Sequence, residues 1–193
     1  ENSLLKLFRV PETREKIFRT LGLLICYRVG FQVPLPGMSI DFIGRAADTG
    51  IFGLLSALSG GALGQTTIFA LGIMPYITAA IIFQLLQTAI PRLQELKREG
   101  AQGQQKITEW TRYATVAMCL VQSVMWLRFL QGSNLINPEF LQPGTIMVFY
   151  LAGITTLSAG SIFLMWLGEQ IDKYGIGNGV SLIITAGIVA GMP

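Results

Sequence analysis

The chain has 193 residues, of which 51% are hydrophobic and only 13% are charged, and its net charge is +3. Because a soluble domain carries about 25% charged residues, this composition excludes water as the solvent for most of the chain. Histidine is absent, which removes the commonest general base and metal ligand. We therefore expect an all-α membrane protein with no catalytic residue, metal or cofactor.

The apolar runs predict a bundle of helices, since a hydrocarbon core of about 30 Å needs roughly 20 apolar residues. Residues 1–10 are expected to form an amphipathic helix on the cytoplasmic side, unless they are a frayed end. The five predicted spans are 17–36, 67–90, 110–131, 145–167 and a fifth that begins near 180 and is truncated at 193. Polar loops are expected over 92–109 and 132–144, and a glycine-rich turn over 168–179.

The apolar segment 51–64 is too short to cross the membrane and is broken by Gly60, Gly61 and Gly64. Non-helical backbone at membrane depth is tolerated only inside protein or beside an aqueous cavity. We therefore expect a short re-entrant helix, which marks the first functional region.

Positive charge is distributed unevenly along the chain. Eleven of the fourteen Lys and Arg residues lie on one predicted side: Lys6, Arg9, Arg14, Lys16, Arg19, Arg92, Lys97, Arg98, Lys106, Arg112 and Lys173. The positive-inside rule places this side, with the N-terminus, in the cytoplasm. Arg28 and Arg128 lie within or near the ends of spans, where snorkelling is expected. Cys26 and Cys119 lie in apolar runs and are interpreted as small buried hydrophobes.

Two long stretches resemble signatures of the SecY family: GGALGQTTIFALGIMPYITAAIIFQLL over 60–86 and FLMWLGEQIDKYGIGNGVSLI over 163–183. VPLPG over 33–37 and KREGAQGQQKITEWTRYAT over 97–115 fit the same pattern in the same order. Two departures are Asp172, where the family pattern favours Thr, Ser or Asn, and Ala80, where a small polar residue is usual.

The resemblance implies one half of a protein-conducting channel built from two inverted halves of five helices. Its pore subunit would pass unfolded secretory polypeptides across the membrane and release transmembrane segments laterally into lipid. A plug would come from 51–64, with these apolar side chains and hinge glycines: Ile51, Phe52, Leu54, Leu55, Leu58, Gly50, Gly60 and Gly61. Ile73, Ile77 and Ile184 would contribute to an apolar pore ring that the missing half completes.

The residues support part of this ring independently. Ile73 and Ile77 are four apart on one expected helical face, and Pro75 between them would bend the helix. An apolar constriction can exclude water and ions by dewetting. The alternative is that both isoleucines merely pack against neighbouring helices.

Polar amides at membrane depth usually hydrogen-bond between helices. The resemblance makes Gln84 and Gln122 candidates for a lateral gate, with ordinary interhelical hydrogen bonding as the alternative. It also implies the partners SecE, SecG, SecA or the ribosome, together with signal sequences, nascent polypeptides, membrane lipids and the C-terminal half. The location would be the bacterial inner membrane, or a thylakoid membrane.

Two other functional classes fit the sequence less well. A secondary transporter also uses broken helices, but it usually places ionisable groups at the midplane to couple ions, and the interior of the predicted second, fourth and fifth spans is free of charged residues. An intramembrane hydrolase is disfavoured because the sequence offers no histidine and no acidic pair inside the membrane.

Overall fold

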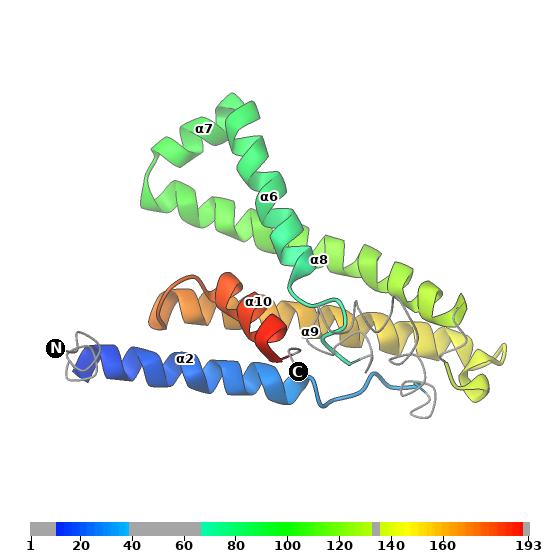
Figure 1. The fold of residues 1–193 in the computed structure, drawn as a ribbon. Coiled ribbons are helices and arrows are strands. Elements are labelled where there is room, and N and C mark those ends of the chain that lie inside the picture. The colour runs from blue at the N-terminus through cyan, green and yellow to red at the C-terminus, as the bar shows by residue number, and fades with distance from the viewer. Residues whose placement is uncertain (1–10, 39–66, 133–135, 191–193) are drawn as a thin grey trace. The chain divides into compact units, whose positions relative to one another are not determined.

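A computed structural model describes residues 11–38, 67–132 and 136–190 of the chain. In these ranges the elements are α2 (Pro11–Gly30), α6 (Met74–Ala89), α7 (Pro91–Arg98), α8 (Ala101–Gly132), η1 (Pro138–Leu141), α9 (Ile146–Tyr174) and α10 (Gly179–Ala190) (Figure 1). The described residues form no strand beyond isolated bridges such as Pro34 with Thr67. The all-α prediction is therefore confirmed at this level, whereas the amphipathic 1–10 helix and the 51–64 plug lie outside the described residues.

Two described helices, α8 and α9, are long and apolar enough to cross a membrane. At about 1.5 Å per residue, their 32 and 29 residues exceed the thickness of the hydrocarbon core. A third crossing results if α6 and α7, which meet at 98°, form one broken span. α2 does not meet this test, and α10 is a shorter apolar helix. The count of five spans stays a prediction.

The predicted polar loop over 92–109 is wrong, because α7 and the start of α8 occupy most of it. Glu, Lys, Gln and Arg are good helix formers, so their polarity indicates exit from the membrane and not the end of a helix. The break between α6 and α7 falls at Ile90, which is extended with φ −105° and ψ 116°. Residues before proline disfavour the α region, so Pro91 forces this corner.

Two further boundaries differ from prediction. α9 continues to Tyr174, so the predicted turn over 168–179 shrinks to residues 175–178, where Gly177 has a φ of +79°. The first predicted span, 17–36, corresponds to a helix that begins at Pro11 and ends at Gly30. Proline at the first position suits a helix start, and Phe31–Val33 form the following turn.

The chain divides into two compact units, Glu1–Ala70 with Phe163–Pro193, and Leu71–Ile162. In the first unit an aromatic cluster joins α2 to distant segments: the ring centroids of Tyr27 and Phe31 are 4.8 Å apart, those of Phe31 and Phe69 5.6 Å, and those of Phe69 and Phe163 6.0 Å. A Cβ at Gly30 would lie 1.9 Å from Phe69 Cε2. Gly30 is therefore required for this close packing.

In the second unit, α6 and α7 pack against α8, and the three helices enclose a triangle in Figure 1. The residues that α8 buries recur almost every fourth position and are mostly small: Gly103, Ile107, Thr111, Thr115, Cys119, Ser123, Leu127 and Leu130. Small side chains let membrane helices approach closely. Cys119 is buried as predicted, whereas Cys26 on α2 is exposed, so the prediction for Cys26 is wrong.

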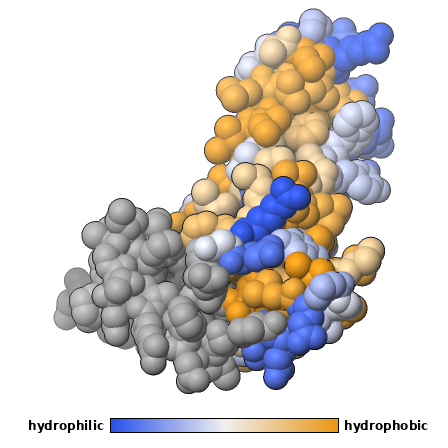
Figure 2. Space-filling model, turned by 90° about the vertical axis from the view of Figure 1, so that its right-hand side faces the viewer, coloured by the Kyte–Doolittle hydropathy of each residue, from blue (hydrophilic) through white to orange (hydrophobic). Residues whose placement is uncertain are grey.

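The surface carries many large apolar side chains, and hydrophobic colour covers most of the non-grey face in Figure 2. Exposed examples are Phe18 and Ile25 on α2, Leu85 on α6, Met125 on α8 and Met147 on α9. A soluble monomer rarely exposes apolar surface on this scale. These faces are suited to lipid or to further protein.

Candidate pore-lining and gate residues

Ile73 and Ile77 flank the first turn of α6. Ile73 is the N-cap residue, and its carbonyl accepts a hydrogen bond of 3.1 Å from the amide of Ile77. The two residues therefore stand one turn apart, with Ile73 buried and Ile77 half-buried. Pro75 lies in the first turn, so the predicted bend inside the helix is wrong: a proline there costs no helical hydrogen bond and starts α6.

Ile184 lies on α10 and is 40% exposed, while its neighbour Ile183 is buried. Ile184 belongs to one compact unit, and Ile73 and Ile77 belong to the other. The two parts of the predicted ring are therefore each described by themselves. The ring stays a prediction.

The start of α10 is fixed by side chains from outside the helix. The carboxylate of Asp172, on α9, accepts a hydrogen bond of 2.6 Å from the Gly179 amide. Asn178 Oδ1 accepts one of 3.0 Å from the Ser181 amide. These two oxygens satisfy amides that a helix N-terminus otherwise leaves unpaired, and sequence reasoning had not assigned this capping role to Asp172.

A second contact ties the same turn to α2. Thr20 Oγ1 accepts a hydrogen bond of 3.2 Å from the Ile176 amide and donates one of 2.8 Å to the Lys16 carbonyl. A Cβ at Gly175 would lie 2.6 Å from Thr20 Oγ1, so the turn can approach this closely only with glycine there. Nothing in the sequence spacing signals this contact, since the partners lie 156 positions apart.

The proposed plug residues and hinge glycines, Ile51, Phe52, Leu54, Leu55, Leu58, Gly50, Gly60 and Gly61, all lie outside the described residues. Gln84 on α6 is exposed, and Gln122 on α8 is half-buried. Both belong to the second unit, where α6 and α8 pack together. No hydrogen bond joins these two amides within the described part of the chain, so the gate assignment stays a prediction.

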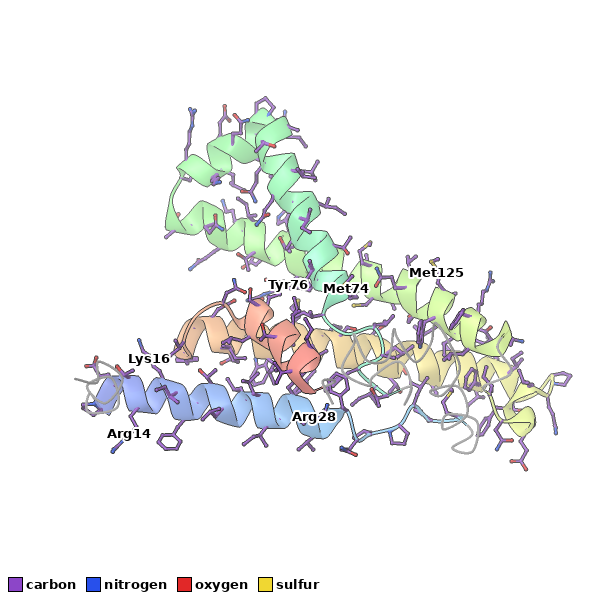
Figure 3. The ribbon with its side chains drawn as sticks, in the orientation of Figure 1. Arg14, Lys16, Arg28, Met74, Tyr76 and Met125 are labelled. Atoms are coloured by element: carbon purple, nitrogen blue, oxygen red, sulfur yellow. The ribbon has the colours of Figure 1, made fainter. Side chains whose placement is uncertain are left out.

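Basic residues mark the ends of α2. Figure 3 shows Arg14 and Lys16 near its N-terminal end and Arg28 near its other end. Arg19 and Lys173 both stand over the ring of Tyr174, at 5.7 and 5.0 Å from its centroid. Cations over aromatic faces are favourable. Two of the basic residues predicted to face the cytoplasm therefore share one aromatic ring at the end of α9. Among the described residues no group of three His, Cys, Asp or Glu could hold a metal.

A sequence profile of the SecY family matches residues 67–193. The chain belongs to the SecY family. Relatives named protein translocase subunit SecY include those of Streptomyces scabiei, 43% identical over 96% of this chain, and Haemophilus influenzae, 44% identical over 94%. The Escherichia coli relative is 42% identical over 94%. The chain spans only 45%, 41% and 41% of these three SecY proteins.

The fold is also that of solved SecY-like channels. The Sec61 channel of the canine ribosome–channel complex from the endoplasmic reticulum aligns with a TM-score of 0.62 and 22% identity. The alignment covers 98% of this chain and 41% of that one, and a second structure, described as a protein-conducting channel, aligns equally well.

Proposed function

We propose that this chain forms part of the pore subunit of a protein translocase, which passes unfolded secretory polypeptides across a membrane and releases transmembrane segments into lipid. The observation that carries the proposal is the identity of 42–44% to translocase subunits over at least 94% of the chain. Such a conduit needs no catalytic group.

The proposed pore ring uses Ile73, Ile77 and Ile184, with the 51–64 segment as plug below it. Support for the first pair is their one-turn separation at the start of α6. Apolar side chains suit a ring that must exclude ions yet bind no passing side chain strongly. Gln84 and Gln122, on two packed helices, are proposed as polar contacts of the lateral gate.

The proposed partners follow from the same resemblance: the remaining helices of the channel, SecE, SecG, and SecA or a ribosome as the driving partner. A ribosome-driven mode is supported by the fold shared with the ribosome-bound Sec61 channel. The proposed location is the bacterial inner membrane, because the relatives compared above come from bacteria.

A chimaera tests the proposal directly. This sequence replaces the matching 41% of the Escherichia coli relative, and the purified chimaeric channel is reconstituted in liposomes with its motor and a secretory precursor. We expect ATP-dependent protection of the precursor from added protease. A chimaera that assembles with its partners but protects no precursor would contradict the proposal.

A further inference from the structure

A groove in the second unit runs between the last turns of α8 and the first turns of α9. It has a volume of about 820 Å³, which is in the range of small-molecule sites, about 300–1,000 Å³. Its principal lining residues stand roughly one turn apart on each helix: Val124, Arg128 and Gln131 on α8, and Ile146, Tyr150 and Ile154 on α9.

The polar side chains of the groove present hydrogen-bond donors. Tyr150 Oη donates a hydrogen bond of 2.6 Å to Gln131 Oε1. This bond uses one lone pair of the Gln131 amide oxygen and orients the side chain, and within the described part of the chain it leaves the amide N–H groups of Gln131 available. Arg128 adds a guanidinium with five donors, and among the described residues it forms no ion pair. The group that complements this end is an anion.

The rest of the groove is apolar. Val124, Ile146 and Ile154 supply its hydrocarbon walls. Arg128 precedes the end of α8 at Gly132 by four residues, which is about 6 Å along the axis, so the charge stands close to the membrane boundary. The α8 C-terminus and the α9 N-terminus lie at this end of the groove and carry partial charges of opposite sign, which largely cancel. The net positive charge of the groove therefore comes from the Arg128 guanidinium.

We propose that this groove binds one anionic phospholipid, whose phosphate lies against Arg128 and Gln131 and whose acyl chain lies along Val124, Ile146 and Ile154. Basic pockets between membrane helices on the cytoplasmic side bind anionic lipid headgroups, and the groove at Arg128 offers the same chemistry at the opposite predicted boundary. Snorkelling alone requires neither a groove nor neighbouring donors. Setting the orientation in the membrane does not explain Arg128 either. The positive-inside rule concerns the cytoplasmic side, where eleven of the fourteen basic residues are predicted, and Arg128 lies on the opposite predicted side.

Native mass spectrometry of the purified translocase that contains this chain tests the site. The complex is incubated with phosphatidylglycerol or phosphatidylcholine. We expect preferential retention of phosphatidylglycerol, about a tenfold weaker affinity in Arg128→Gln, and partial rescue in Arg128→Lys. The matched control, Arg92→Gln on α7, removes an exposed positive charge outside the groove and should bind like the unaltered protein.

A second pair of variants tests the acyl-chain region. Ile154→Trp fills the groove and should also reduce retention of phosphatidylglycerol. Val148→Trp is the control and should leave retention unchanged, because Val148 lies on the same helix but is 62% exposed and outside the groove. Equal retention of both lipids, equal losses in Arg128→Gln and Arg92→Gln, or equal competition by inorganic phosphate would overturn the proposal. Lipid retention is measured without any translocation. A failure of the lipid-site proposal is therefore distinguishable from a failure of the proposed channel function.

Discussion

Of the residues proposed for the pore ring, Ile77 is best suited to substitution, because it is half-buried and lies beyond the N-cap of α6. In Ile77→Ser we expect a several-fold rise in ion leak through the reconstituted channel, since a polar side chain weakens dewetting at a constriction. Single-channel or liposome flux recordings measure this leak. Ile82→Ser, on the same helix and 43% exposed, is the matched control. Equal leak in both variants would refute the ring assignment for Ile77.

Asp172 departs from the family pattern. Its hydrogen bond to the Gly179 amide explains why an aspartate can stand at this position. Thr, Ser and Asn, like Asp, carry an oxygen that can accept the Gly179 amide hydrogen bond. We expect Asp172→Ala to destabilise the turn by about 0.5–1 kcal/mol and Asp172→Asn by less. Hydrogen–deuterium exchange of peptides covering 175–183 measures the difference. Identical exchange in Ala and Asn variants would show that the bond contributes nothing.

At the residue scale the sequence identifies which side chains are apolar and where charge gathers, but not which atoms meet. The one-turn separation of Ile73 and Ile77 was predicted correctly from their spacing, whereas their place in a pore ring stays a prediction. The contact of Thr20 with Ile176 could not be predicted, because it depends on how α2 docks beside a turn far along the chain. The α8–α9 groove was missed for the same reason, since Arg128 and Tyr150 become neighbours only through helix packing.

The corner between α7 and α8 is constrained by Gly103. A Cβ at this position would lie 1.6 Å from the Leu96 carbonyl oxygen. We expect Gly103→Ala to destabilise the protein by about 1–3 kcal/mol, the usual cost of overpacking. Thermal unfolding of the purified channel in detergent measures this as a lower midpoint.

Gly22 on α2 provides the comparison, because a Cβ there meets nothing within 4 Å. Gly22→Ala should raise the midpoint slightly, since alanine favours a helix over glycine by about 1 kcal/mol. A midpoint in Gly103→Ala as high as in Gly22→Ala would mean that the corner relaxes without cost.

At the element scale, α2 begins at Pro11 and the glycine-rich turn separates α9 from α10. The hydropathy pattern instead began the first span at residue 17 and ended the fourth at residue 167. Hydropathy reports where a helix lies in lipid, so it missed the polar extensions of α8 and α9. It also placed Pro75 within a longer helix, because the apolar run over 67–73 does not distinguish turns from helix.

The orientation of the whole molecule is predicted from its basic residues and can be measured by cysteine labelling. In a background with Cys26 and Cys119 replaced by alanine, we expect Glu139→Cys to react with an impermeant maleimide added to intact cells. Glu95→Cys, on α7, should react only after the membrane is opened. Both side chains are exposed, so access depends on the side of the membrane. The reverse pattern would invert the topology.

The first compact unit is discontinuous in sequence: it joins Glu1–Ala70 to Phe163–Pro193 around an uninterrupted second unit. During synthesis the second unit can therefore complete its contacts while the first still lacks Phe163 and the turn that meets Thr20. Domains generally assemble as their residues emerge, so the flank of α2 that carries Thr20 stays uncovered until Phe163 and the turn over residues 175–178 have been synthesised. A chaperone or lipid that covers this flank would govern the yield of folded channel.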